Sequence, residues 1–216
     1  SKELRQSSSP NLANALAGRL AGLTSLQSGG SQPGFDDADL YLRGASTTNG
    51  TRPLILIDGV PRDNIRTLDA NEVATVSVLK DAAATAVYGV RGANGVILIT
   101  TKKGKAGLQR VTFSSNLTVD HAISLPEFQN NYGRKDDQSW GKDGNLKDYD
   151  NAGDFFQNGV TAINSLSLTR GNDKLQTYFS YANTSASGIV EKNKLQKHNL
   201  NFRETAQFFD DRLNID

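Results

Sequence analysis

Two apolar runs near the middle of the chain, Leu54–Ile57 and Val96–Thr101, constrain its fold more than any other feature. A short, nearly unbroken apolar run is typical of a strand that is buried on both faces of a sheet. Between the two runs, Val76 and Val78 flank a serine, which is the two-residue spacing of a strand. The alanine-rich segment Ala82–Tyr88 favours a helix that packs closely on such a sheet. This stretch therefore predicts a small α+β domain.

Turn and cap residues divide the stretch into elements. Asp58-Gly59 ends the first apolar run, because glycine accepts a positive φ and an aspartate side chain bonds nearby backbone amides. Asp69 is a candidate N-cap for a short helix that runs through Val73. Asp81 is a candidate cap for the alanine-rich helix.

Three glycines, Gly89, Gly92 and Gly95, have a spacing that invites comparison with a nucleotide-binding loop. In the dinucleotide fingerprint the glycines follow a strand and open a helix, so that the helix N-terminus faces phosphate. Here they follow the predicted helix and open a strand, and there is no P-loop lysine. We therefore interpret them as turn residues, with Gly89 leaving the helix in a left-handed conformation.

The N-terminal segment predicts a helix from Asn11 to Leu23, with Ser9-Pro10 at its start. Its leucines recur at helical spacing and form one apolar face that needs a sheet to cover it: Leu12, Leu16, Leu20 and Leu23. The residues that follow are rich in serine, glycine and aspartate. They predict surface loops at 27–39, 45–53 and 60–66.

After residue 108 the pattern changes to strict alternation. Apolar residues from Val111 to Val119 alternate with small polar ones, which is the spacing of a strand with one apolar and one polar face. Three further strands are predicted around Leu166–Leu168, Leu175–Tyr181 and His198–Ala206. A fifth begins at 213–215.

The connections between these strands discriminate between two interpretations. Short turns at 171–174 and 209–212 alternate with longer connections at 121–162 and 185–197. Short periplasmic turns and long external loops are the pattern of an outer-membrane β-barrel. A soluble adhesion or interaction module, with the same strands in a water-soluble sheet, remains the alternative.

Composition excludes several other functions. The net charge of +1 gives no electrostatic basis for binding nucleic acid. Cysteine is absent, His121 and His198 are isolated, and the calcium-like start at Asp143 lacks the closing glutamate. No nucleophile–base pair stands in a plausible context. We expect no enzyme activity, no cofactor and no metal.

Three motifs in the central stretch carry a resemblance to a known family: PLILIDGVP, SVLKDAAATAVYG and RGANGVILITTKKGK. They resemble the plug domain of the SusC/RagA family of TonB-dependent outer-membrane receptors. Leu40–Gly44 is similar to the family's strand ending in Arg-Gly, and the segment 11–23 to the first helix of the plug. The resemblance implies an α+β plug with a small mixed sheet at 1–108. The first antiparallel strands of a 22-stranded transmembrane barrel would follow at 109–216.

The resemblance also implies a function. Receptors of this family import glycans or peptides across the bacterial outer membrane, with the plug inside the barrel lumen. The implied partners are a SusD-like surface lipoprotein, TonB, the oligosaccharide or peptide substrate and outer-membrane lipid. We expect both ends to be truncated, with the segment that contacts TonB lying before Ser1.

By analogy with the family, three loops of the plug resemble those that touch the ligand from above. The candidate substrate-binding residues in these loops are Phe35, Asp36, Thr47, Asn49, Arg52 and Arg62. A second set lies at strand ends and turns, where charges can pair with the barrel wall and hold the pore closed, or can serve as ordinary turn and cap residues. This set is Arg43, Asp58, Lys80, Asp81 and Arg91.

Overall fold

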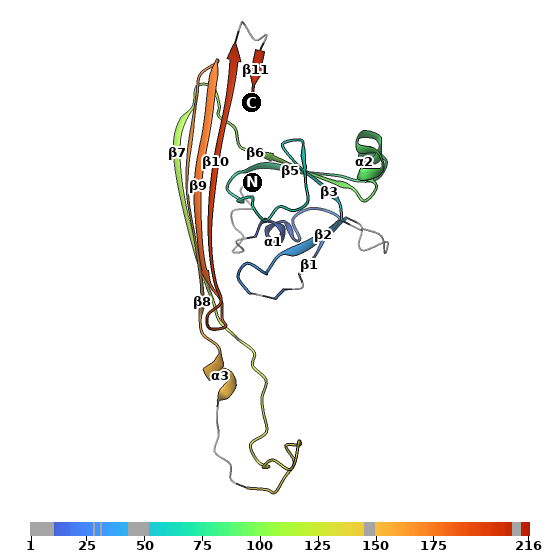
Figure 1. The fold of residues 1–216 in the computed structure, drawn as a ribbon, viewed down its shortest axis with the longest axis vertical. Coiled ribbons are helices and arrows are strands. Elements are labelled where there is room, and N and C mark those ends of the chain that lie inside the picture. Colours follow the sequence, from blue (N-terminus) through green and yellow to red (C-terminus); the bar gives the residue numbers. More distant parts are fainter. Residues whose placement is uncertain (1–10, 28, 31, 43–51, 145–149, 209–212) are drawn as a thin grey trace.

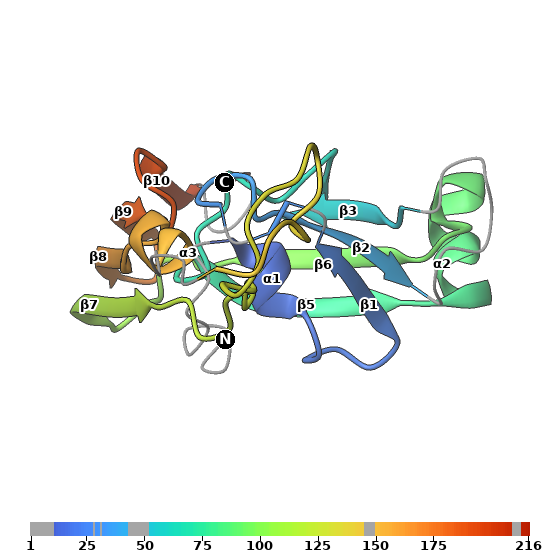
Figure 2. The same cartoon turned by 90° about the horizontal axis from the view of Figure 1, so that it is seen from below.

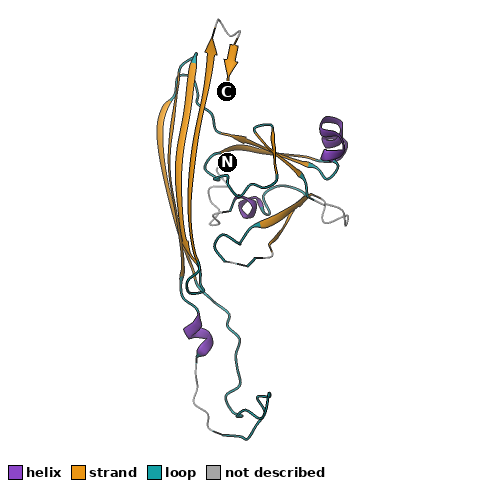
Figure 3. Cartoon of the chain, in the orientation of Figure 1, coloured by secondary structure: helices purple, strands orange, loops and turns teal. Residues whose placement is uncertain are grey.

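The chain, seen in a computed structural model, consists of a compact N-terminal part beside a tall, curved sheet (Figure 1). The structure describes residues 11–27, 29–30, 32–42, 52–144, 150–208 and 213–216. We call residues 11–101 the N-terminal core and the tall sheet the strand wall. Strands dominate both parts, and the helices are short (Figure 3).

The N-terminal core holds two small sheets. One is the antiparallel pair β1 (Leu23–Gln27) and β2 (Ala38–Leu42). The other has the order β4-β3-β6-β5, in which β3 and β6 are parallel and the outer strands are antiparallel to them. Its strands are β3 (Leu54–Ile57), β4 (Val60–Arg62), β5 (Val73–Leu79) and β6 (Val96–Thr101).

Both faces of the four-stranded sheet are covered. On one face Ile97 and Ile99 of β6 pack in a core with Leu12 and Leu16 of α1 (Leu12–Leu16), which are almost completely buried. On the other face Val96 packs near α2 (Asp81–Tyr88) and η2 (Gly89–Gly92) in a smaller cluster. Figures 1 and 2 place α2 at the end of the sheet away from the strand wall. The continuous apolar runs thus have the burial on both faces that their sequence predicts.

The strand wall is one antiparallel sheet in the order β11-β10-β9-β8-β7. Its strands run up and down as neighbours, and among the described residues they do not close on themselves. The long connection between β7 and β8 contains α3 (Asn151–Phe155). The strands are β7 (Gln109–Asp120), β8 (Gly159–Gly171), β9 (Leu175–Ser187), β10 (Lys194–Phe208) and β11 (Leu213–Ile215).

The fold class is confirmed: a mixed-sheet domain with few helices is followed by antiparallel strands. The Asp58-Gly59 turn is confirmed too, because both residues have positive φ, 48° and 84°, and join β3 to β4 in a tight hairpin. In the described part of the chain, no helix is long and apolar enough to span a membrane.

The helix predicted from Asn11 to Leu23 is wrong beyond Leu16. Asn11 caps α1 by accepting a hydrogen bond from the amide of Ala13 at 3.0 Å, and Ser9-Pro10 lies outside the described residues. Gly18 and Gly22 have φ values of 68° and 78°, so the chain leaves the helix and Leu23 starts β1. Leu23 still reaches the core, but from a strand.

Three other expectations need correction. The helix from Asp69 to Val73 is a turn, in which Asp69 accepts a hydrogen bond from the amide of Asn71 at 2.5 Å. The loop predicted at 60–66 begins with β4, an edge strand that tolerates its proline. The long connection predicted at 185–197 is a turn of residues 188–193, because β9 and β10 pair almost to their ends.

Gly95 offers a test of the core packing. Its φ is 87°, and a Cβ there would lie 2.5 Å from Cδ1 of Leu42 and 3.2 Å from the carbonyl oxygen of Leu79. Gly107 has a φ of 70° with open space around it and is the matched control. Both alanine variants bear the cost of a left-handed alanine, about 1–2 kcal/mol. We expect Gly95→Ala to lose roughly a further 1–3 kcal/mol by overpacking, measured as a lower thermal midpoint of the purified receptor. Equal midpoints for the two variants would contradict this packing.

Candidate functional site: the contact between the N-terminal core and the strand wall

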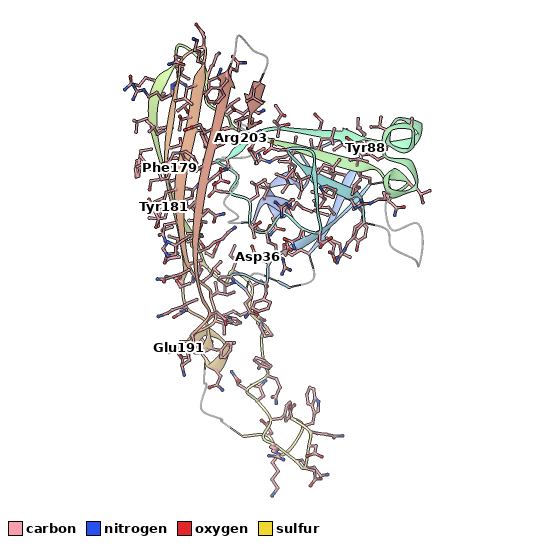
Figure 4. All side chains as sticks on the ribbon, turned by 45° about the horizontal axis from the view of Figure 1, so that its top comes forward. Asp36, Tyr88, Phe179, Tyr181, Glu191 and Arg203 are labelled. Carbon is pink, nitrogen blue, oxygen red and sulfur yellow. The ribbon has the colours of Figure 1, made fainter. Side chains whose placement is uncertain are left out.

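One polar stripe on β10 faces the N-terminal core along most of its length. Alternate residues of the strand point inward, and four of them in succession bond to the core: Lys197, Asn199, Asn201 and Arg203. Figure 4 labels Arg203 on the side of the wall that faces the core. The two-residue period of the strand produces this stripe, because residues i, i+2 and i+4 line one face.

Two of these side chains bond to backbone of the core. Nζ of Lys197 donates to the carbonyl oxygen of Arg66 at 2.5 Å, and the amide of Asn199 donates to the carbonyl oxygen of Thr67. These two carbonyls belong to the segment between β4 and β5, which has no strand partner of its own. Side chains of the wall thus donate hydrogen bonds to backbone carbonyl groups of the core that do not belong to a strand.

Glu72 is a buried carboxylate at the centre of the contact. Its oxygens accept hydrogen bonds from Oγ of Ser180 at 3.2 Å and from the amide of Asn201 at 3.3 Å. Burial raises the pKa of Glu72 above its ordinary value, although the hydrogen bonds from Asn201 and Ser180 oppose the shift. The contact therefore holds a carboxyl group whose charged form is poorly solvated.

Asp58 and Arg203 form the ion pair of the contact. Nη1 of Arg203 lies 3.1 Å from Oδ2 of Asp58 and donates to Oγ1 of Thr101 at 3.0 Å. Asp58 also accepts from the amide and hydroxyl of Thr101, at 2.9 and 2.6 Å. Burial alone raises the pKa of Asp58, but the bonds from Thr101 and the charge of Arg203 outweigh it and leave the pKa below its ordinary value.

Arg203 links three parts of the chain, because its remaining nitrogens bond to Asp216 just after β11. Nε lies 2.6 Å from Oδ1 and Nη2 lies 2.5 Å from Oδ2 of that carboxylate, a bidentate geometry. Lys103, between the core and β7, adds a third contact to Asp216 at 3.0 Å. The guanidinium group of Arg203 therefore joins the core to the end of the described chain, and the connector reaches the same cluster through Asp216.

The structure brings one of the five charged turn residues from the sequence to this contact, namely Asp58. Lys80 instead donates to the carbonyl oxygen of Ala21 within the core, and Arg91 is exposed on η2, directly after α2. Asp81 lies in α2, but its side chain is not described, and Arg43 lies outside the described residues. The gating role of this set stays a prediction.

Four of the six candidate ligand residues, Phe35, Asp36, Arg52 and Arg62, are among the described residues. Phe35 is exposed and precedes Asp36. The backbone oxygen of Asp36 accepts a hydrogen bond from the side-chain amide of Asn14 at 2.5 Å. Arg62 is exposed on β4, whereas Arg52 pairs with Asp39 at 2.6 Å. Thr47 and Asn49 lie outside the described residues.

A polar cavity of about 300 Å³ lies next to Arg52, between β2 and the segment after β4. Its charged rim is Asp37, Asp39, Arg52, Asp63 and Arg66. Asp37 pairs with Arg66 across it. Of the six candidates, only Arg52 is among the residues that line it.

The sequence interpretation missed Glu72 and the cations of β10. The sequence does contain a pattern that marks the polar face of β10, because Asn199, Asn201 and Arg203 alternate with apolar residues along a predicted strand. Which core residues meet that face depends on how the two parts dock, and no local pattern contains this information.

Comparisons with known proteins agree on one family. The model of the TonB-dependent Receptor Plug Domain matches residues 1–96. The TonB-dependent receptor SusC of Bacteroides thetaiotaomicron is 31% identical over 98% of this chain, which covers 22% of SusC. The TonB-dependent receptor P39 of Formosa agariphila is 37% identical over 61% of the chain, which covers 12% of that receptor.

A solved structure has the same fold. The RagAB peptide importer in its open-open state superposes with a TM-score of 0.77 over 97% of this chain and 28% of that chain, at 22% identity. The chain thus spans between 12% and 28% of the relatives and the structure it matches.

Glu72 predicts a pH dependence of the contact. Because its pKa is raised in the folded protein, it contributes stability that is complete below its unfolded pKa of about 4.3 and is lost as pH rises through the raised value. Glu72→Gln removes this loss. We expect the thermal midpoint of the variant to exceed that of the wild type by about 2–4 °C at pH 7, and the difference to vanish near pH 4.

The control is Glu191→Gln, on the turn between β9 and β10, where the glutamate is exposed (Figure 4). That variant is expected to follow the wild type at every pH. A difference for Glu72→Gln that is constant across pH would show that burial does not govern its titration.

Proposed function

Because this chain belongs to the SusC/RagA-type TonB-dependent receptors, we propose that it forms the plug and the first wall strands of an outer-membrane importer of glycans or peptides. The N-terminal core lies within the plug, which we assign to 1–108, and the wall strands occupy 109–216. TonB would supply the energy and a SusD-like lipoprotein would close the outer side. The comparisons give no support to a soluble adhesion module.

The observation that carries this proposal is the contrast between the two faces of the strand wall. The inward face is polar and bonds to the core, whereas the outward face exposes large apolar side chains that no other described part of the chain covers. A sheet that alternates between lipid outside and a polar lumen inside has this pattern. The outward residues include Val111, Phe113, Leu117, Val119, Leu200, Phe202 and Phe208.

The outward apolar residues form a band that crosses the strands obliquely. On β7 the band reaches Val119, but the paired row through that residue becomes polar by β9 and β10, at Ser187 and Lys194. Past the row of Val111 the next outward row is polar, at Gln109, Arg170, Thr177 and Glu204, and large apolar residues recur beyond it on β10 and β11, at Phe208 and Leu213. An oblique band is expected where tilted strands cross a flat membrane.

The two ends of the wall differ in their connections, which assigns its direction. The connection of residues 121–158 and the turn at 188–193 lie at one end, and the tight turn between β8 and β9 lies at the other (Figure 1). Since barrels have short periplasmic turns and longer external loops, the end with residues 121–158 faces the cell exterior. The loop around Gly34 lies against Leu195 near that end, as expected of a plug loop that faces the incoming substrate.

A charge in the band tests whether lipid covers it. Phe202 lies within the band, whereas Gln196 lies on the same outward face of β10 but beyond it. Phe202→Arg is expected to cost up to about 2–4 kcal/mol, the range for a cation at the membrane midplane, and Gln196→Arg close to nothing. Quantitative blots of outer-membrane fractions should therefore show less Phe202→Arg receptor. Equal amounts of both variants would speak against a lipid-facing band.

The ion pair between Asp58 and Arg203 tests the closed state of the plug. Arg203→Ala leaves Asp58 without its cation, which costs on the order of 1 kcal/mol because the pair is partly exposed and Asp58 keeps its hydrogen bonds to Thr101. We expect this variant to admit vancomycin, a solute too large for porins, even in cells without TonB. Arg19→Ala, which removes an exposed cation of the N-terminal core outside the gating set, is the control and is expected to stay sealed.

The same cells test import itself. Uptake of a labelled oligosaccharide or peptide by the wild-type receptor should require TonB, and absence of any TonB-dependent uptake would refute the proposed function. A sealed Arg203→Ala variant with normal abundance would refute only the role of the ion pair.

A further inference from the structure

The connection between β7 and β8 carries a small ordered hairpin at residues 129–144. Its arms are joined by backbone hydrogen bonds, from the amide of Gly133 to the carbonyl of Lys142 and from the amide of Gly144 to that of Asn131, both at 3.0 Å. Lys135 and Gln138 exchange two bonds of 2.9 Å across the turn. The hairpin therefore has a defined shape although it projects beyond the strand wall (Figure 1).

One side chain braces this hairpin from inside. Nε2 of Gln129 donates to the carbonyls of Tyr132 and Ser139, at 2.9 and 2.6 Å. Its Oε1 accepts from the amides of Asn131 and Tyr132, at 3.1 and 2.8 Å. Since these bonds reach Tyr132 on one arm and the neighbour of Trp140 on the other, they fix the backbone that presents the two rings.

Tyr132 and Trp140 form an aromatic pair on this hairpin. Their ring centroids are 5.5 Å apart and the planes are inclined at 45°. Trp140 is 68% exposed and Tyr132 is 38% exposed, so the pair contributes little to any core. The other residues from 131 to 144 are glycine, polar or charged. The fold gives no reason for two fixed, exposed rings at this place.

We propose that this pair is a binding site for a sugar ring of an oligosaccharide, which stacks on Trp140 with Tyr132 at its edge. The inference rests on the proposed function and names a first contact for its substrate at the cell exterior. One face of a pyranose carries C–H groups with partial positive charge, which complement the negative π face of an indole. Its hydroxyls project sideways, where hydrogen-bonding side chains are needed.

The surroundings of the rings supply such groups. Arg134 and Asp137 form an exposed ion pair at 3.6 Å on the same hairpin, and Gln138 and Lys142 flank the turn and the second arm. A protein partner fits less well, because the core of a protein interface needs a desolvated cluster of apolar anchors. Two rings among polar residues offer one small apolar surface, which is the size of a single sugar ring.

The test uses the full-length receptor, purified in detergent and titrated calorimetrically. The probes are maltohexaose, cellohexaose and xylohexaose, with a mixture of synthetic hexapeptides for comparison. We expect at least one oligosaccharide to bind and Trp140→Ala to weaken its affinity about tenfold, while Trp140→Phe retains most of it. The control is Phe128→Ala, which removes another exposed ring of the same connection outside the pair and is expected to bind like the wild type.

Each other result overturns the inference. Equal affinities for Trp140→Ala and Phe128→Ala, with either both normal or both weakened, would exclude a specific stacking site. A loss confined to the hexapeptides would exclude a sugar ligand. Uptake by wild-type cells distinguishes a failure of this sugar site from a failure of the proposed import function. If wild-type uptake requires TonB but Trp140→Ala binds oligosaccharide normally, the sugar site is refuted and the import function stands.

Discussion

The structure depends on a polar seam, in which the inward side chains of β10 donate hydrogen bonds that the plug accepts. Lys197 and Asn199 reach backbone carbonyls, whereas Asn201 and Arg203 reach carboxylates. Each such bond has a net worth of only about 0.5–1.5 kcal/mol, because water can replace either partner. Many of them together hold the plug in one position. Unlike an apolar seam, they can also be exchanged for water when the plug is displaced.

Asp58 shows how closely the plug's own fold is tied to this seam. It turns the chain from β3 to β4 with a left-handed backbone, a conformation that costs a non-glycine residue about 1–2 kcal/mol. Its carboxylate fastens the end of β6 through Thr101 and meets Arg203 of the wall. The strained turn is therefore supported by contacts on both sides, and a change in the docking of the plug acts directly on the register between β3 and β6.

The sequence predicts what is local and misses what depends on docking. Leu54–Ile57 and Val96–Thr101 are confirmed as strands to the residue, because a buried apolar run needs no distant information. The helix predicted to Leu23 is wrong, since helical spacing of leucines cannot reveal that Gly18 and Gly22 take left-handed conformations. Asp58 and Arg91 look alike as charges beside a turn, yet only Asp58 lies at the wall. Tertiary packing, which no local sequence pattern reveals, decides which of these two charges reaches the wall.

The two-residue period of the strands gives the wall one apolar and one polar face. The tilt of the strands determines how the apolar band on one face is placed relative to the polar contacts on the other. Residues one apart on β10 meet different media: Phe202 faces outward, and Arg203 faces the plug. Because the apolar band crosses the strands obliquely, the outward face of the first residues of β10 lies outside the band, while the inward Lys197 in this part of the strand still bonds to the plug. The polar seam therefore extends along β10 past the end of the apolar band. There the wall holds the segment between β4 and β5 by polar bonds, which water can replace, rather than by apolar packing.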